Sequence, residues 1–82
     1  MIETEVAVIE ETVNKIRPFL AGLPPELQGA ILAELAAVWV AGHHIEGDVE
    51  ATAEFRSDLL ESYLSLVEEM IPVKARMLGS TV

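Results

Sequence analysis

The sequence predicts an all-α protein. We expect either a three-helix up-down-up antiparallel bundle or a helical hairpin with an N-terminal helix, completed in each case by homodimerisation. Apolar residues recur every three or four positions along most of the chain, Gly and Pro interrupt this pattern, and only 5% of the residues are aromatic. We expect one helical domain over residues 1 to 82, with helices at about 2 to 17, 25 to 46 and 49 to 71 and a frayed C-terminus at 79 to 82.

The first predicted helix carries a heptad seam of apolar residues. Its members alternate spacings of four and three: Ile2, Val6, Ile9, Val13, Ile16, Leu20 and Leu23. Early acidic residues such as Glu3 and Glu5 lie off the seam, where they suit a helix N-terminus. A helix packed in a bundle and a coiled coil both produce this pattern. Because Pro18 lacks a backbone donor, we expect the regular helix to end near Arg17.

The second predicted helix is apolar on nearly every side. Between residues 27 and 45, Glu34 is the only formally charged residue. A membrane span needs roughly 20 apolar residues, and Glu34 and the following His pair interrupt this run, so we expect a helix packed on protein. Its core and interface positions are predicted to be Ile31, Leu35, Ala37, Val38 and Trp39. Gly29 and Gly42 each predict a close backbone contact or, for Gly42, an early helix end.

A short turn separates this helix from the third one. Gly47 can take the left-handed conformation and Asp48 can cap the next helix. The third helix shows an apolar row that includes Phe55 and Leu59, with acidic residues over much of the remaining surface. Arg56 is expected to form a surface pair with an acid one turn away, and Pro72 is expected to end or kink the helix.

Charge and cysteine content limit the classes of partner. The chain carries 14 acidic and 5 basic residues, a net charge of −9, and has no Lys or Arg between Pro18 and Phe55. This disfavours nucleic acid and anionic membranes as partners and favours a basic protein partner or simple solubility. The absence of Cys excludes disulfides and thiolate metal sites. Because the N-terminal residues also show no secretory signal, we expect a cytoplasmic protein.

The segment from His43 to Glu50 is the one stretch that resembles a metal-ligand cluster. His43, His44 and Glu46 are its predicted ligands, since imidazole and carboxylate suit Zn, Fe or Mn. The spacing matches no established metal motif, and a His pair near a helix end also complements the helix dipole. Metal binding at this segment is therefore an alternative hypothesis. The main prediction requires no cofactor.

The main functional prediction is a non-enzymatic, self-associating module for protein assembly. The second helix has more apolar surface than two amphipathic neighbours can cover, so we expect a homodimer or a higher homo-oligomer. No catalytic motif is present: there is no Cys, no phosphate-binding glycine loop and no Ser near the His pair. The alternatives are a metal or small-ligand site at the His43 to Glu50 turn, and a small subunit or antitoxin-like inhibitor of a larger protein.

Overall fold

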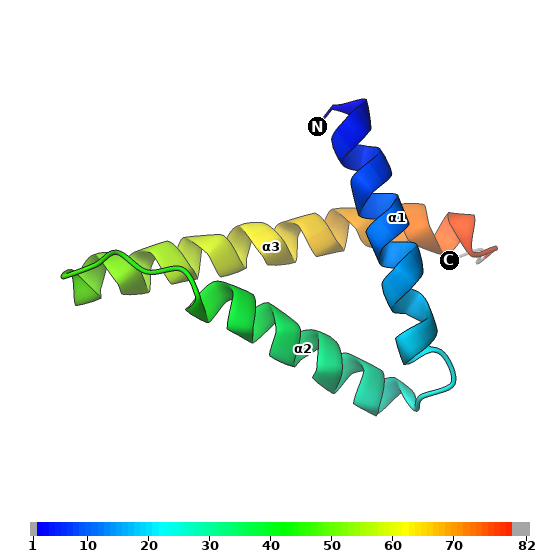
Figure 1. Ribbon diagram of the computed structural model, residues 1–82, viewed down its shortest axis with the longest axis horizontal. Helices are drawn as coiled ribbons and strands as arrows, with labels where there is room; N and C mark the ends of the chain where they lie inside the picture. The colour runs from blue at the N-terminus through cyan, green and yellow to red at the C-terminus, as the bar shows by residue number, and fades with distance from the viewer. Residues whose placement is uncertain (1, 80–82) are drawn as a thin grey trace. The chain divides into compact units, whose positions relative to one another are not determined.

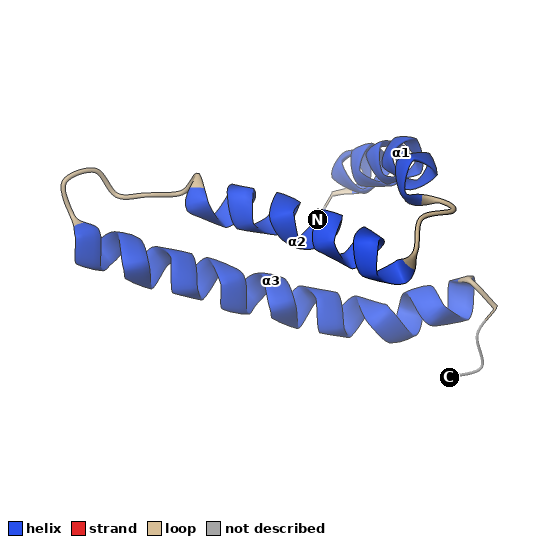
Figure 2. Cartoon of the chain, turned by 90° about the horizontal axis from the view of Figure 1, so that it is seen from below, coloured by secondary structure: helices blue, strands red, loops and turns tan. Residues whose placement is uncertain are grey.

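The computed structural model describes residues 2 to 79 and contains three α-helices. These are α1 (Glu3–Leu20), α2 (Pro25–Ala41) and α3 (Val49–Met77), and no strand occurs within the described range (Figures 1 and 2). The predicted all-α class is therefore confirmed. The described chain divides after Glu34, inside α2, into two compact units. The first contains α1 and the beginning of α2, and the second contains the end of α2 and α3.

In the first unit, α1 continues past the proline that was expected to end it. The helix includes Pro18 and extends to Leu20, three residues beyond the predicted end at Arg17. Pro18 lies in the last turn, so it removes one hydrogen bond there, while the Ala21 N–H still donates to the Arg17 carbonyl over 3.1 Å. Gly22 then takes a φ of 83°, the left-handed conformation that commonly ends a helix.

The turn after α1 is held by a side chain from α2. The Gln28 amide Nε2 donates to the Leu20 carbonyl over 2.7 Å, and both residues are half-buried. This bond satisfies one of the carbonyls that the end of a helix leaves without an internal partner. It also joins α1 to the first turn of α2 within the unit.

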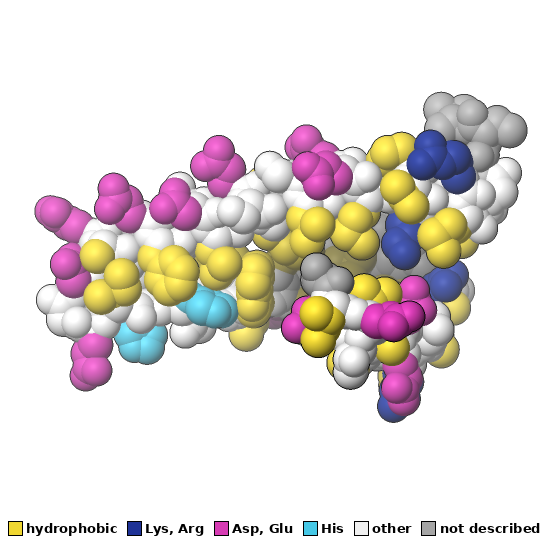
Figure 3. All heavy atoms as spheres, turned by 90° about the horizontal axis from the view of Figure 1, so that it is seen from above, with side chains coloured by type: hydrophobic (Ala, Val, Ile, Leu, Met, Phe, Trp, Pro, Cys, Tyr) yellow, Lys and Arg dark blue, Asp and Glu magenta, His cyan; other side chains and the backbone are white. Residues whose placement is uncertain are grey.

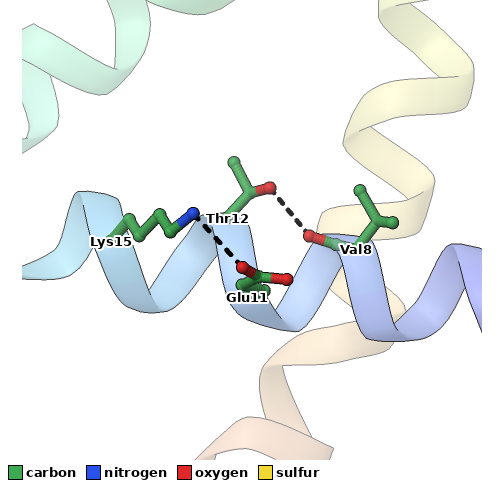
Figure 4. Close-up of polar contacts among 4 residues, drawn as sticks. All are labelled: Val8, Glu11, Thr12 and Lys15. Carbon is green, nitrogen blue, oxygen red and sulfur yellow. Dashed lines mark hydrogen bonds and ion pairs between the residues drawn. The ribbon is translucent and has the colours of Figure 1, made fainter.

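Two polar contacts lie along the surface of α1 (Figure 4). Lys15 Nζ pairs with Glu11 one turn earlier at 3.2 Å, and the Thr12 hydroxyl donates to the Val8 carbonyl over 2.7 Å. Both contacts are exposed and local to the helix. An exposed pair of this kind stabilises a helix by only about 0.3–0.5 kcal/mol, so these contacts contribute little to the stability of α1.

In the second unit, a seven-residue loop separates α2 from α3. We predicted that the second helix would extend to Glu46, but α2 ends at Ala41, and Gly42 donates the last helical bond to the Val38 carbonyl over 2.9 Å. From this end onward, backbone carbonyls bind side chains of α3: those of Ala41 and His43 accept from Arg56, and that of Ile45 lies within reach of the Thr52 hydroxyl. Asp48 caps α3 through a 2.9 Å bond from the Ala51 N–H, and Gly47 has a φ of 79°, so both predictions for this turn are confirmed.

Helix α3 is longer than predicted. It continues through Pro72 to Met77, six residues past the predicted end at Ile71. Beyond the proline the ladder continues, and Leu78 N–H still donates to the Lys74 carbonyl over 3.0 Å. Lys74 and Arg76 lie in the last turn, where positive charge complements the helix dipole. The predicted fraying of residues 79 to 82 falls mostly outside the described range.

The end of α2 and the N-terminal half of α3 form an antiparallel helical hairpin. Trp39, near the end of α2, contacts Tyr63. His43, four residues later in the chain, contacts Phe55, which lies eight residues before Tyr63 in α3. Contacts that run in opposite directions along the two segments define antiparallel packing. Among the described residues, no helix is long and apolar enough to cross a membrane.

Candidate functional site

Four aromatic rings cluster between the end of α2 and α3. The ring centroids of Trp39 and His43 are 5.6 Å apart with planes at 77°, and His43 meets Phe55 at 5.7 Å and 86°. Trp39 also lies 5.6 Å from Tyr63 at an interplanar angle of 52°. The two near-perpendicular contacts have the edge-to-face geometry that aromatic rings prefer, and pairs of this kind stabilise by about 0.5–1.5 kcal/mol each. The cluster therefore anchors the hairpin.

His43 is oriented by the helix that precedes it. Its Nδ1 lies 2.7 Å from the Trp39 carbonyl oxygen. Because a carbonyl can only accept, Nδ1 must carry the proton and donate, which leaves Nε2 as the acceptor atom of the neutral ring. This bond and the two ring contacts fix the imidazole, a half-buried side chain. In Figure 3 the histidine side chains lie beside a row of apolar side chains.

Arg56 fastens the loop to α3. Its guanidinium Nε donates to the His43 carbonyl over 3.0 Å, and Nη2 donates to the Ala41 carbonyl over 2.7 Å. The expected surface pair of Arg56 with an acid is wrong: within residues 2 to 79 the one ion pair is that of Lys15 with Glu11. The carbonyls at the end of a helix lack internal partners and carry partial negative charge, so a guanidinium that donates to them is favourable there.

Thr52 binds the same loop from the preceding turn of α3. Its Oγ1 accepts from the Ile45 N–H over 2.9 Å. Its single hydroxyl hydrogen has two acceptors within reach, the Asp48 carbonyl at 2.8 Å and the Ile45 carbonyl at 3.1 Å. Arg56 and Thr52 therefore hold the loop at separate points. Sequence reasoning missed both roles, because all partners but the Asp48 carbonyl lie seven to fifteen residues away and no local pattern connects them.

The predicted metal ligands are not brought together within one chain. No group of three His, Cys, Asp or Glu side chains in the described part of the chain could hold a metal ion. His43 is directed into the aromatic cluster, while His44 and Glu46 line a hollow of about 520 Å³ between the loop and α3. The loop separates the imidazole of His43 from the other two because the helix ends at Ala41 and does not align these residues on one face.

The predicted core and interface residues occupy different environments. In the second unit, Trp39 contacts other rings of its own chain and is still 44% exposed, Leu35 and Val38 are 59% and 66% exposed, and Ala37 is exposed as well. In the first unit, Ile31 is half-buried. Trp39 thus contributes to packing inside the hairpin, and Leu35, Ala37 and Val38 form an apolar surface that solvent reaches.

A second hollow lies in the first unit. It has a volume of about 640 Å³ and lies between α1 and the start of α2, with Gln28, Arg17 and apolar side chains in its wall. Both hollows are open to solvent.

Comparison with known protein families, with curated proteins and with solved structures finds no match to this chain.

Proposed function

We propose that this chain is a non-enzymatic assembly module that associates with itself through apolar helix faces and presents an acidic exterior to a further protein. The observation that carries the proposal is the exposure of apolar side chains. No described residue is fully buried, and Leu35 and Val38 each expose more than half of their surface on a helix with little charge.

The energetics favour covering these side chains. Moving one Leu or Val side chain from water into a packed interior stabilises a protein by about 1.5–3 kcal/mol. A chain of this size with a single small core has only about 3–5 kcal/mol of stability from that core. Burial of a few exposed apolar side chains in an interface would therefore contribute as much as folding the single chain does.

The acidic surface supports the second part of the proposal. The net charge is −9. The acidic residues of α3 include Glu54, Asp58 and Glu61, whose positions lie off the helix face that carries Phe55 and Leu59. Complementary charge speeds association and favours basic partners. A small subunit that docks on a larger protein is the main alternative, since an exposed apolar face would serve either purpose.

The test is the absolute mass in solution, measured by light scattering after size exclusion over a hundredfold range of concentration. Self-association predicts a dimer or larger species that dissociates only on dilution. A monomer at every concentration would refute it and direct attention to a larger protein partner.

A pair of variants then shows whether the α2 surface takes part. Ala37→Glu adds a negative charge to this surface, and Ser57→Glu adds the same charge to an exposed position of α3. A lower mass in solution for Ala37→Glu alone would place the face of α2 around Ala37 in the interface. Equal masses in both variants would place the interface on another helix.

A further inference from the structure

The heptad seam of α1 is a continuous apolar face in the structure. Because α1 extends through Pro18 to Leu20, six of the seven predicted seam positions lie on or next to one helix of 18 residues. Four of them, Val6, Ile9, Val13 and Ile16, have exposed fractions between 39% and 46%. The helix is about 27 Å long at 1.5 Å per residue, so the seam could pair along this length with a second helix.

Charges beside the seam select the partner and its direction. In heptad notation the seam residues occupy a and d, and the flanking e positions are Glu3, Glu10 and Arg17. The flanking g positions include Glu5 and Thr12. Lys15 lies off the seam and already pairs with Glu11 of its own helix. Arg17 is therefore the cation of α1 that flanks the seam.

We propose that α1 pairs with α1 of a second copy of this chain in an antiparallel arrangement, with Glu3 of each copy beside Arg17 of the other. This inference rests on the proposed self-association and names its surface. When Val6 faces the second copy's Ile16 and Ile9 faces its Val13, the e rows of the two helices face each other, as in any antiparallel pair. Glu3 of each copy then lies beside Arg17 of the other copy, which gives one such pair at each end of the dimer contact.

The parallel arrangement is less favourable. There a g residue faces the e residue five positions later on the partner, so Glu5 would face Glu10 twice and no opposite charges would meet. The antiparallel arrangement has two attractive contacts and a single like-charge contact, Glu10 with Glu10 at the axis. Thr12 also lies near the axis, and its hydroxyl is satisfied by the Val8 carbonyl within its own helix.

The apolar surface of α2 has no flanking charges that would favour one binding partner over another. Between residues 27 and 45 it offers only Glu34 as a charge, so it carries no complementary pattern. The α1 seam is the face whose flanking charges match a second copy of itself.

Matched charge-neutral variants test the pairing through the dimer Kd. Glu3→Gln removes both attractive contacts and should raise the Kd about fivefold, at a few tenths to 1 kcal/mol per exposed pair. Arg17→Gln should have the same effect, and the double variant should be no weaker than either single one, because each removes the same contact. Glu5→Gln is the control: Glu3 and Glu5 both lie in the first turn of α1, so the two variants change the helix-dipole energy alike.

The control also separates the two directions. Antiparallel pairing leaves the Kd of Glu5→Gln unchanged, whereas parallel pairing would tighten it about fivefold by removing two repulsive contacts. An unchanged Kd in Glu3→Gln, or a tighter dimer in Glu5→Gln, would overturn the inference while the protein remains a dimer. A wild-type protein that is monomeric throughout would instead overturn the proposed self-association itself.

Spin labels measure the direction independently of stability. The chain has no Cys, so Thr4→Cys and Glu11→Cys each provide one labelling site, and both lie at the outward f position of the heptad. Antiparallel pairing places the two labels at residue 11 level with each other and those at residue 4 about 21 Å apart along the axis. Equal distances from the two sites would show a parallel pair and overturn the inference.

Discussion

Replacing Arg56 with Ala should destabilise the hairpin strongly. The guanidinium donates two hydrogen bonds, one to the Ala41 carbonyl at the end of α2 over 2.7 Å and one to the His43 carbonyl in the loop over 3.0 Å. A hydrogen bond with a charged partner stabilises a protein by about 1.5–3 kcal/mol when buried. Because Arg56 is only half-buried, we expect the lower end of this range and a total loss of about 2–3 kcal/mol. For a domain of this size the loss lowers Tm by roughly 10–20 °C.

The assay is urea unfolding at one fixed protein concentration, since association would otherwise shift the midpoint. The chain has a single Trp, and Trp39 lies in the aromatic cluster beside the loop that Arg56 holds, so its fluorescence reports the unfolding of this part. The midpoint should fall while the slope of the transition stays the same. Arg76→Ala removes the same charge from an exposed position in the last turn of α3 and should cost no more than about 0.5 kcal/mol.

Two further variants separate the hydrogen bonds from packing. Arg56→Met keeps most of the aliphatic stem and should lose nearly as much stability as Arg56→Ala, because only the donors are missing. Arg56→Lys keeps the charge but presents a single ammonium in place of the planar fork, so it should recover about half of the loss. If Arg56→Met were as stable as the wild type, the two carbonyl contacts would contribute nothing and the reasoning would fail.

Two glycine substitutions should have opposite effects in the same urea assay. Gly47→Ala should cost about 1–2 kcal/mol, because its φ of 79° places an L side chain in the left-handed region; a stability equal to that of the wild type would mean that the turn relaxes. Gly29→Ala should stabilise the chain by up to about 1 kcal/mol, since Gly29 lies inside α2 and a Cβ there meets no atom within 4 Å in the described part of the chain. If Gly29→Ala instead reduced the mass in solution, Gly29 would lie in the interface between copies.

The Gly29 result also bears on the sequence prediction. We expected the helical glycines to mark close approach of another backbone, but the space around Gly29 is open. Gly42 follows the second expectation and lies directly after the end of α2, where a Cβ would come within 3.3 Å of the Val38 carbonyl. Gly42 therefore marks the end of α2, whereas Gly29 marks no close contact within the described chain, and the sequence alone does not separate the two cases.

The sequence by itself determined the elements whose cause is local. Apolar spacing predicted the three helices, and the Gly47 and Asp48 turn was predicted because left-handed φ and N-capping depend on a residue and its next three neighbours. The helix ends near Pro18 and Pro72 were placed too early, because the cost of a proline is one hydrogen bond and the helical bonds on either side can outweigh it.

The tertiary structure decided what depends on residues far apart in the chain. It ended α2 at Ala41 and gave Arg56 two backbone carbonyls, thirteen and fifteen residues away, in place of an acid one turn away. It also gave Trp39 a ring contact with Tyr63 at 44% exposure, while Leu35 and Val38 are 59% and 66% exposed. Periodicity identifies an apolar residue without specifying what covers it, because burial depends on the approach of a second element that the pattern of one helix does not encode.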